Sequence, residues 1–368
     1  MPKEEGVLVE LTSLIRHTWR HRPGNEIPGL ILDTFDNLRF ETKDKRRPVM
    51  VSKQKTPYGW YLVFNLPPGI SFKQCKAKEN FFSDAVKGFV NMTWNGQLHM
   101  EIQTSELPNY VEYAWDSGKY EHMELPIPIG CSQKGLEVFD LCDSPHLLVG
   151  GQTGWGKTMF LHCLANALIP RAWVCISDPK RLDFRYLGRY ILLARDDEEA
   201  QGLLKALLKE YGRRIALLEQ ADVSVTKIQE YDSTLPYIVA IFDEVAQISK
   251  ESMEMLTKLA QLARAVGIHL VAATQRPDVS VIPGQCRDLF EARMCFKVGS
   301  EISSRVILGE ECSKAAWLPA VKGRAIFRFG GEFKEVQTMC LSKEQRKKIA
   351  FPERGWEFEQ TTKRLFPR

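Results

Sequence analysis

The stretch that decides the fold of this chain reads Gly150-Gly151-Gln152-Thr153-Gly154-Trp155-Gly156-Lys157-Thr158. From Gly151 to Thr158 it matches the pattern G-x-x-x-x-G-K-[ST], and the apolar run 146–149 leads into it as a strand would. Glycines in this pattern let backbone N–H groups converge on phosphates, and the helix that follows adds the positive end of its dipole. Lys157 would reach the β- and γ-phosphates, and Thr158 would hold Mg²⁺. The stretch therefore predicts a nucleoside triphosphate site over residues 151–158.

Two further apolar runs end in polar residues that suit hydrolysis. The run 237–242 ends in Asp243 and Glu244; the first suits a role around Mg²⁺, and the second can polarise the attacking water. The run 267–273 is followed closely by Gln275, whose amide could sense the γ-phosphate or orient water. Because the carboxyl ends of parallel strands meet at one edge of a sheet, these groups should share one site. The order of runs predicts an α/β fold with a parallel sheet.

Composition narrows the class of protein. With 368 residues, 44% of them hydrophobic and 26% charged, the chain is long enough for about two ordinary globular domains. Its net charge of +4 does not by itself identify a nucleic-acid binder. No apolar run is long enough to span a membrane, and the first residues lack a signal-peptide core. The nine cysteines are scattered without a C-x-x-C pair, which indicates reduced thiols in an intracellular, soluble protein.

Changes in pattern along the chain divide it into four segments. Residues 1–48 are expected to form an N-terminal arm or accessory segment, and 49–125 a small α+β domain of short strands around one helix from Phe72 to Val90. Residues 126–341, where strands alternate with helices, form the expected ATPase domain, and 342–368 a C-terminal tail. The fold class expected is thus a RecA-like P-loop NTPase domain with a parallel sheet and flanking helices, preceded by the small domain.

Several stretches carry a family resemblance. They are Ser144 to Thr158, Asp178-Pro179-Lys180, Phe242-Asp243-Glu244 and, most specifically, Ala263 to Pro277. On these residues the chain resembles the motor domain of FtsK/SpoIIIE-type DNA translocases, strongly over 125–335 and more weakly over 50–115. The resemblance implies a ring, usually a hexamer, that threads double-stranded DNA through its centre. It also implies hydrolysis of ATP with Mg²⁺ between neighbouring subunits.

The resemblance also assigns roles to basic residues. Arg264 matches the family's arginine finger, although an arginine at a helix end can also be favoured by the dipole alone. Arg287 and Arg305 match positions on pore loops that touch DNA phosphates, and Arg305 could instead form a local ion pair. Glu301 stands where a basic pore residue is expected. Either Lys297 substitutes for it, or this loop is not the main DNA contact.

The given sequence lacks the membrane bundle of chromosomal translocases and has too few residues after Leu341 for their winged-helix domain. We therefore expect a minimal motor, similar to those of plasmids and integrative conjugative elements, that serves conjugation or segregation. It would be cytoplasmic, without direct membrane insertion, and recruited by a membrane-channel or relaxosome partner. Two alternatives remain open: a type VII secretion-like protein-export ATPase, and a nucleotide-dependent scaffold that does not translocate.

Overall fold

The computed structural model describes residues 27–351, which fall into two compact units. One unit comprises the described residues up to Pro108 together with Cys131–Gly135. The other comprises Asn109–Gly130 and the described residues from Leu136 onward, and is called the motor unit after the domain expected there. The first boundary between the units falls between Pro108 and Asn109, whereas the sequence pattern predicts a domain boundary at 125/126.

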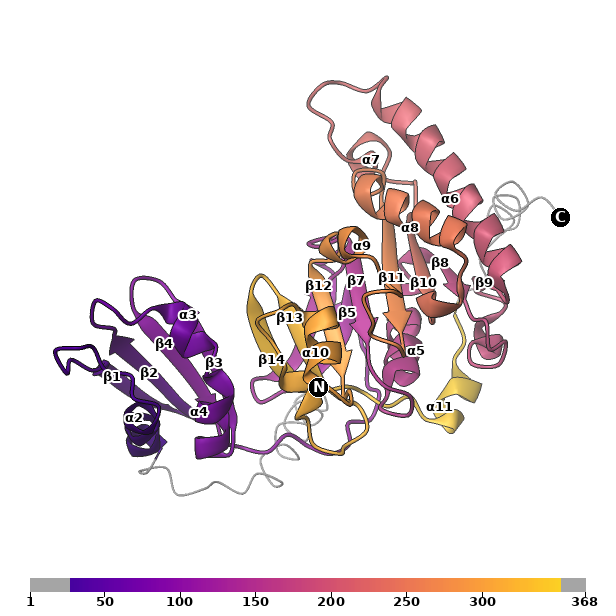
Figure 1. The fold of residues 1–368 in the computed structure, drawn as a ribbon. Helices are drawn as coiled ribbons and strands as arrows, with labels where there is room; N and C mark the ends of the chain where they lie inside the picture. Colours follow the sequence, from indigo (N-terminus) through magenta and orange to yellow (C-terminus); the bar gives the residue numbers. More distant parts are fainter. Residues whose placement is uncertain (1–26, 352–368) are drawn as a thin grey trace, which may run out of the picture. The chain divides into compact units, whose positions relative to one another are not determined.

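The small unit is a four-stranded antiparallel sheet with helices packed against it (Figure 1). Its strand order is β1-β2-β4-β3, and alternate residues of β4 point into the core. Helix α2 adds Ile27, Ile31 and Phe35 to the same core. The segment expected to be an arm, 1–48, thus includes a helix of the small unit, while residues 1–26 lie outside the described part. The elements are α2 (Ile27–Asn37), β1 (Val49–Thr56), β2 (Gly59–Asn65), α3 (Phe72–Lys76), α4 (Glu79–Val86), β3 (Phe89–Trp94) and β4 (Leu98–Gln103).

The single helix expected from Phe72 to Val90 is wrong. Ser71 opens α3 with a capping box, but the helix ends after one turn, and α4 begins separately. Helix α4 stops because Lys87 adopts a left-handed conformation with φ 47°. A Cβ on Gly88 would lie 2.4 Å from the carbonyl oxygen of Gln103, so glycine is required where the chain turns back to pair with β4.

The motor unit is built on a ten-stranded sheet in the order β6-β5-β14-β13-β12-β7-β11-β10-β8-β9. Strands β12 to β9 in this order are parallel neighbours, as expected, whereas β13 and β14 extend the sheet with antiparallel pairs. The sheet is therefore mixed. Its strands are β5 (Pro126–Ser132), β6 (Gly135–Asp140), β7 (His146–Gly150), β8 (Ala172–Ser177), β9 (Ile191–Ala194), β10 (Tyr237–Phe242), β11 (Ile268–Thr274), β12 (Ala292–Phe296), β13 (Arg324–Phe329) and β14 (Glu332–Gln337).

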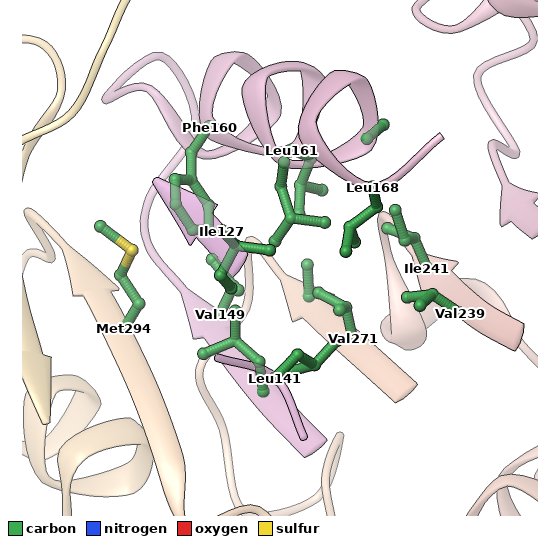
Figure 2. Packing of buried hydrophobic residues seen from close by; sticks show 14 of the residues in the cluster. Ile127, Leu141, Val149, Phe160, Leu161, Leu168, Val239, Ile241, Val271 and Met294 are labelled. Atoms are coloured by element: carbon green, nitrogen blue, oxygen red, sulfur yellow. The ribbon is translucent and has the colours of Figure 1, made fainter. Parts of the chain in front are cut away.

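Helices flank this sheet because alternate strand residues point to opposite faces. Phe160, Leu161 and Leu168 of α5 pack over Val149 and Val271, as Figure 2 shows. On the other face, Nε2 of His146 lies 2.8 Å from the carbonyl oxygen of Ala260 in α8. The helices are α5 (Lys157–Leu168), α6 (Asp197–Leu218), α7 (Ile228–Tyr231), α8 (Lys250–Leu262), α9 (Gly284–Asp288), α10 (Glu301–Leu308) and α11 (Lys343–Lys348).

The first part of the expected tail, 342–368, belongs to the motor unit. Ser342 caps α11 with a capping box, and Gln345 donates to the carbonyl oxygen of Tyr113 at 2.9 Å. The N–H of Leu341 lies 3.3 Å from the sulfur of Met159 on α5. The chain after β14 is thereby attached to the helix that begins at the P-loop.

Candidate active site

The P-loop connects β7 to α5 in a conformation that only glycine tolerates easily. Gly151, Gly154 and Gly156 have φ values of 155°, 88° and 116°. A Cβ on Gly156 would lie 2.9 Å from the backbone of Gly323, whose N–H donates to the carbonyl oxygen of Trp155 at 2.8 Å. The loop is thus held from outside, while the first-turn N–H groups of α5 have no acceptor within the helix. This geometry suits a phosphate chain.

Lys157 makes a buried ion pair with Asp243. Its Nζ lies 2.8 Å from Oδ1 of Asp243 and also donates to that residue's carbonyl oxygen, and the two side chains are 3% and 0% exposed. Asp243 directly follows β10, which lies two strands from β7 in the sheet. From there its side chain reaches Lys157 at the end of the P-loop. The lysine and the aspartate expected to serve the nucleotide and its metal therefore neutralise each other in this structure.

Glu244 is held in place by the neighbouring strand end. Its carboxylate accepts a hydrogen bond of 2.8 Å from the hydroxyl of Thr274 and one of 2.9 Å from the N–H of Gln275. The Gln275 side chain in turn accepts from the Thr153 hydroxyl at 2.6 Å. Three predicted site residues, Thr153, Glu244 and Gln275, are thus joined in one network. Two hydrogen bonds fix a carboxylate that is 5% exposed.

Two acidic residues that the sequence analysis gave no role lie beside Asp243. Asp178 directly follows β8 and is buried. It lies next to Asp243 because the residues before them, Ser177 and Phe242, are paired across β8 and β10. It accepts from the N–H groups of Asp183 and Phe184 at 3.0 and 3.3 Å. Carboxylate oxygens of Asp178, Asp183 and Asp243 lie within 4.8 Å of one another. Burial and then repulsion by the other two carboxylates raise the pKa of Asp183.

The residues present fit a bound cation. Oδ2 of Asp243 and Oδ1 of Asp178 are buried without a hydrogen-bond partner in the described part of the chain. Buried carboxylate oxygens of this kind need a cation, a proton or water. Thr158, in the first turn of α5, is partly exposed and available from the cavity side. Thr158 and Asp243 are therefore suitable residues for Mg²⁺, with Asp178 close by.

A cavity of about 440 Å³ opens against the P-loop, large enough for a nucleotide. The P-loop, Gln275, the segment 109–111 and residues 337–340 at the end of β14 and after it all contribute to its lining. Its lining residues are Asn109, Tyr110, Val111, Gln152, Thr153, Gly154, Gly156, Lys157, Thr158, Met159, Lys180, Gln275, Lys322, Gly323, Gln337, Thr338, Met339 and Cys340.

Arg264 lies just after α8 and is exposed. Its guanidinium donates to the carbonyl oxygen of Asp143 at 3.5 Å, a long and weak contact. The residue does not belong to the described lining of its own cavity. An exposed arginine with one weak contact is free to approach another molecule.

The three residues expected to touch DNA each have a local partner. Arg287 donates to the carbonyl oxygen of Val306 at 3.2 Å, and Lys297 donates to that of Leu318. Arg305 lies 2.8 Å from Glu301 in an ion pair one helical turn apart, with a side chain that is 39% exposed. The local ion pair weighed for Arg305 is therefore present, and its anion is Glu301, the residue that stands where the resemblance places a basic pore residue.

The fold and the site define a P-loop nucleotide-binding domain with a RecA-like mixed sheet. Residues 143–279 match the family model described as an AAA domain. A DNA translocase FtsK of Chlorobaculum tepidum is 35% identical over 218 residues, 52% of this chain and 27% of that protein. The protein of that name in Clostridium tetani is 32% identical over 321 residues, 78% of this chain and 42% of its own length. The chain is thus similar to the motor region of FtsK-type DNA translocases and spans less than half the length of these relatives.

Solved structures share the fold. The monomer form of the pCW3 conjugation coupling protein TcpA with ATPγS superimposes with a TM-score of 0.61 at 23% identity, covering 87% of this chain and 97% of that one. The cytoplasmic domain of the Thermomonospora curvata type VII secretion ATPase EccC gives 0.54 at 20% identity, over 72% of this chain and 33% of its own. None of the helices between residues 27 and 351 is both long and apolar enough to cross a membrane.

Proposed function

We propose that this chain is an ATP-hydrolysing motor that moves double-stranded DNA as a ring, most simply a hexamer. The observation that carries this proposal is the network at the strand ends, where Lys157, Asp243, Glu244 and Gln275 meet beside the P-loop cavity. A pure scaffold has no need of a buried carboxylate held by two hydrogen bonds next to a nucleotide site. Relatives at 32–35% identity carry the name DNA translocase, which supports DNA as the substrate.

The chemistry follows from how these residues are held. Binding of ATP would draw Lys157 from Asp243 toward the phosphates, because both hydrogen bonds that its Nζ makes in this structure go to Asp243. Thr158 and Asp243 would hold Mg²⁺, whose charge would offset that of the phosphates when it is bound. Glu244 can then accept a proton from water, because Thr274 and the Gln275 N–H fix its orientation. Thr153 and Gln275, which share a hydrogen bond and line the cavity, would sense the γ-phosphate.

A ring explains why Arg264 lies outside its own cavity. Charge that develops on the transferred phosphoryl group is stabilised by a further cation, and such an arginine is often supplied in trans. Arg264 is exposed and weakly held, so it can enter the cavity of a neighbouring subunit at little cost. Hydrolysis would then depend on assembly.

Contacts to DNA are proposed for Arg305, Arg287 and Lys297. Arg305 is partly exposed and would exchange Glu301 for a phosphate. Arg287 and Lys297 would each give up a hydrogen bond to a carbonyl oxygen. Replacing Arg305 by alanine should lower DNA affinity equally for all sequences and reduce the salt dependence of binding by about one ion. If the affinity for DNA does not change, Arg305 serves only the ion pair with Glu301.

Plasmid or mobile-element transfer is the proposed setting. The similar fold of a conjugation coupling protein supports a coupling role, with the motor in the cytoplasm and a membrane-channel or relaxosome partner. The type VII secretion ATPase has a similar fold at 20% identity, so protein export is the alternative function to be tested. Steady-state ATPase assays separate the possibilities. Linear duplex DNA should raise turnover severalfold, whereas stimulation by a peptide alone, or no turnover at all, would contradict a DNA motor.

A further inference from the structure

The turn that carries Arg264, residues 263–267, has a backbone that is held at every carbonyl group. Each carbonyl oxygen of this turn accepts at least one hydrogen bond. In the order of these carbonyl groups, the donors are the N–H groups of Val266 and Ile268, of Gly267 and of Ile228, the guanidinium of Arg214 and the N–H group of Ile238. The backbone of the turn is therefore fixed, although the exposed Arg264 side chain has one long contact of 3.5 Å.

Arg214 reaches this turn from α6, and its side chain is only 1% exposed. Its guanidinium donates to the carbonyl oxygens of Val266 and Pro236, both at 2.8 Å, and to the carboxylate of Glu210 at 2.8 Å. A guanidinium is planar and has its donors in fixed directions, so one arginine holds these three acceptors in a single arrangement. Arg214 thereby joins the turn after α8 to the residue that precedes β10.

Helix α6 also holds the other end of α8, beside which it packs (Figure 1). Asp197, in the first turn of α6, accepts from the N–H of Ser249 at 2.8 Å and from the hydroxyl of Ser252 at 3.1 Å. Ser249 is the N-cap of α8. Helix α6 is thus bonded to α8 at its beginning and to the turn that follows its end, which gives Arg264 a defined place on the motor unit.

Arg214 and Arg264 lie at the edge of the sheet away from their own nucleotide site. Val266 comes before β11, whereas Gln275 follows it, and the P-loop follows β7, which runs parallel to β11. Strand β11 has seven residues and is about 23 Å long, more than an arginine side chain can reach. Any effect of Arg214 on hydrolysis through Arg264 must therefore act on the site of another subunit.

We propose that Arg214 is a positioning residue for hydrolysis, which fixes the turn 263–267 so that Arg264 enters the neighbouring subunit's site in one orientation. The inference rests on the proposed ring and on the action of Arg264 in trans. A group that stabilises a transition state must be placed accurately, because a misplacement of about 1 Å costs about 100-fold in rate. A loosened turn would leave Arg264 charged and exposed but would present its guanidinium in many positions.

The first test compares Arg214→Lys with Arg213→Gln. Lysine keeps the positive charge but lacks the planar fork that reaches three acceptors. Arg213 is the matched control, because it also pairs with Glu210 and both of its hydrogen bonds go to that residue. In ATPase assays of the full chain with Mg²⁺ and linear duplex DNA, Arg214→Lys should lower kcat about 100-fold and change KM by less than about twofold. Arg213→Gln should resemble the wild type.

Mixed rings distinguish a positioning role from a general loss of stability. Arg214→Lys subunits keep an intact P-loop, so mixing them with Lys157→Ala subunits, which keep Arg264 in its fixed turn, should restore part of the turnover. Mixing them with Arg264→Ala subunits should restore none. The double variant Arg214→Lys/Arg264→Ala should be no slower than Arg264→Ala alone, because both changes remove the same interaction.

A second variant loosens the turn and leaves the buried arginine in place. Ile228→Pro removes the N–H that donates to Ala265, at the first residue of α7, where proline is tolerated. It should lower kcat and recover with Lys157→Ala subunits in the same way, and it serves as the test if Arg214→Lys does not fold.

Three results would overturn the positioning role: a wild-type kcat in the folded variants, a loss of kcat that adds to that of Arg264→Ala, or no recovery in rings shown to be mixed with Lys157→Ala subunits. An Arg264→Ala variant with full turnover would instead refute the proposed action of Arg264 in trans, and the positioning role with it.

Discussion

Breaking the ion pair between Lys157 and Asp243 should destabilise the nucleotide-free protein, in addition to abolishing catalysis. The pair is almost completely buried, with an N–O distance of 2.8 Å. Two more carboxylates, Asp178 and Asp183, lie within 4.8 Å of the Asp243 oxygen. Lys157→Met keeps the apolar stem of the side chain but removes its charge. Asp243 then remains as a buried anion beside two others.

The magnitude can be worked from the distance and the burial. Two unit charges 2.8 Å apart attract by about 6 kcal/mol at an effective dielectric constant of about 20. Desolvation offsets part of this, and removal of one partner of a buried pair costs about 3–5 kcal/mol. For a domain the size of the motor unit, that loss lowers the melting temperature by roughly 6–20 °C. Asp243→Asn should cost less, because it also relieves repulsion with Asp178 and Asp183.

A double-mutant cycle measures the pair itself. Urea unfolding without nucleotide or Mg²⁺ gives the free energy of unfolding for the wild type, Lys157→Met, Asp243→Asn and the double variant. A parallel cycle on Arg181 and Asp196 is the matched control, because that pair is 2.9 Å apart but 60% and 44% exposed. The buried pair should couple by about 2 kcal/mol or more, and the exposed pair by about 0.2–1 kcal/mol. Equal coupling in the two cycles would refute a buried pair in the resting site.

Three further predictions concern catalysis, assembly and pH. Glu244→Gln should bind ATP with near-normal affinity yet lose turnover, since only water activation is removed; loss of ATP binding in calorimetry would assign the residue a different role. Arg264→Ala should lose about 10³-fold in turnover while binding ATP, and rings mixed with Lys157→Ala subunits should regain activity. No recovery in rings shown by native mass spectrometry to be mixed would place Arg264 in cis. Burial lowers the pKa of His162 and His269 to about 3, so below about pH 6.5 the unfolded chain binds protons that the folded chain does not. The free energy of unfolding should therefore fall by about 2 kcal/mol for each of these histidines from pH 7.5 to 5 in urea titrations, and a flat profile would contradict their neutral burial.

The centre of the motor unit could be predicted from the sequence because its strands are buried on both faces. A strand of that kind reads as an unbroken apolar run, and the runs before Gly151, Asp243 and Gln275 became β7, β10 and β11. Their polar ends had to meet, since parallel strands place their carboxyl ends at one edge. The network among Thr153, Glu244 and Gln275 follows from this order.

What the sequence did not reveal depends on contacts between distant residues. The antiparallel pairs of β12, β13 and β14 need partners that local periodicity cannot name, so the predicted parallel sheet did not include them. The pairing of Lys157 with Asp243 and the approach of Asp178 require the register of β8 on β10. The segment 109–111 lines the cavity beside Cys340 because Glu112 forms a bridge with Cys340, more than two hundred residues away. The sequence offered two signals for Asp178: it directly follows the run 173–177, and it begins one of the stretches that carry the family resemblance.

Movement along DNA is the central claim, and displacement of a third strand from linear duplex DNA measures it directly. The wild-type chain with ATP and Mg²⁺ should displace a triplex-forming oligonucleotide placed at a distance from the free end, at a rate that depends on ATP. Glu244→Gln should bind the same DNA without displacing the oligonucleotide. The account would be contradicted if the oligonucleotide stays in place while the wild-type protein hydrolyses ATP at a rate that does not depend on DNA.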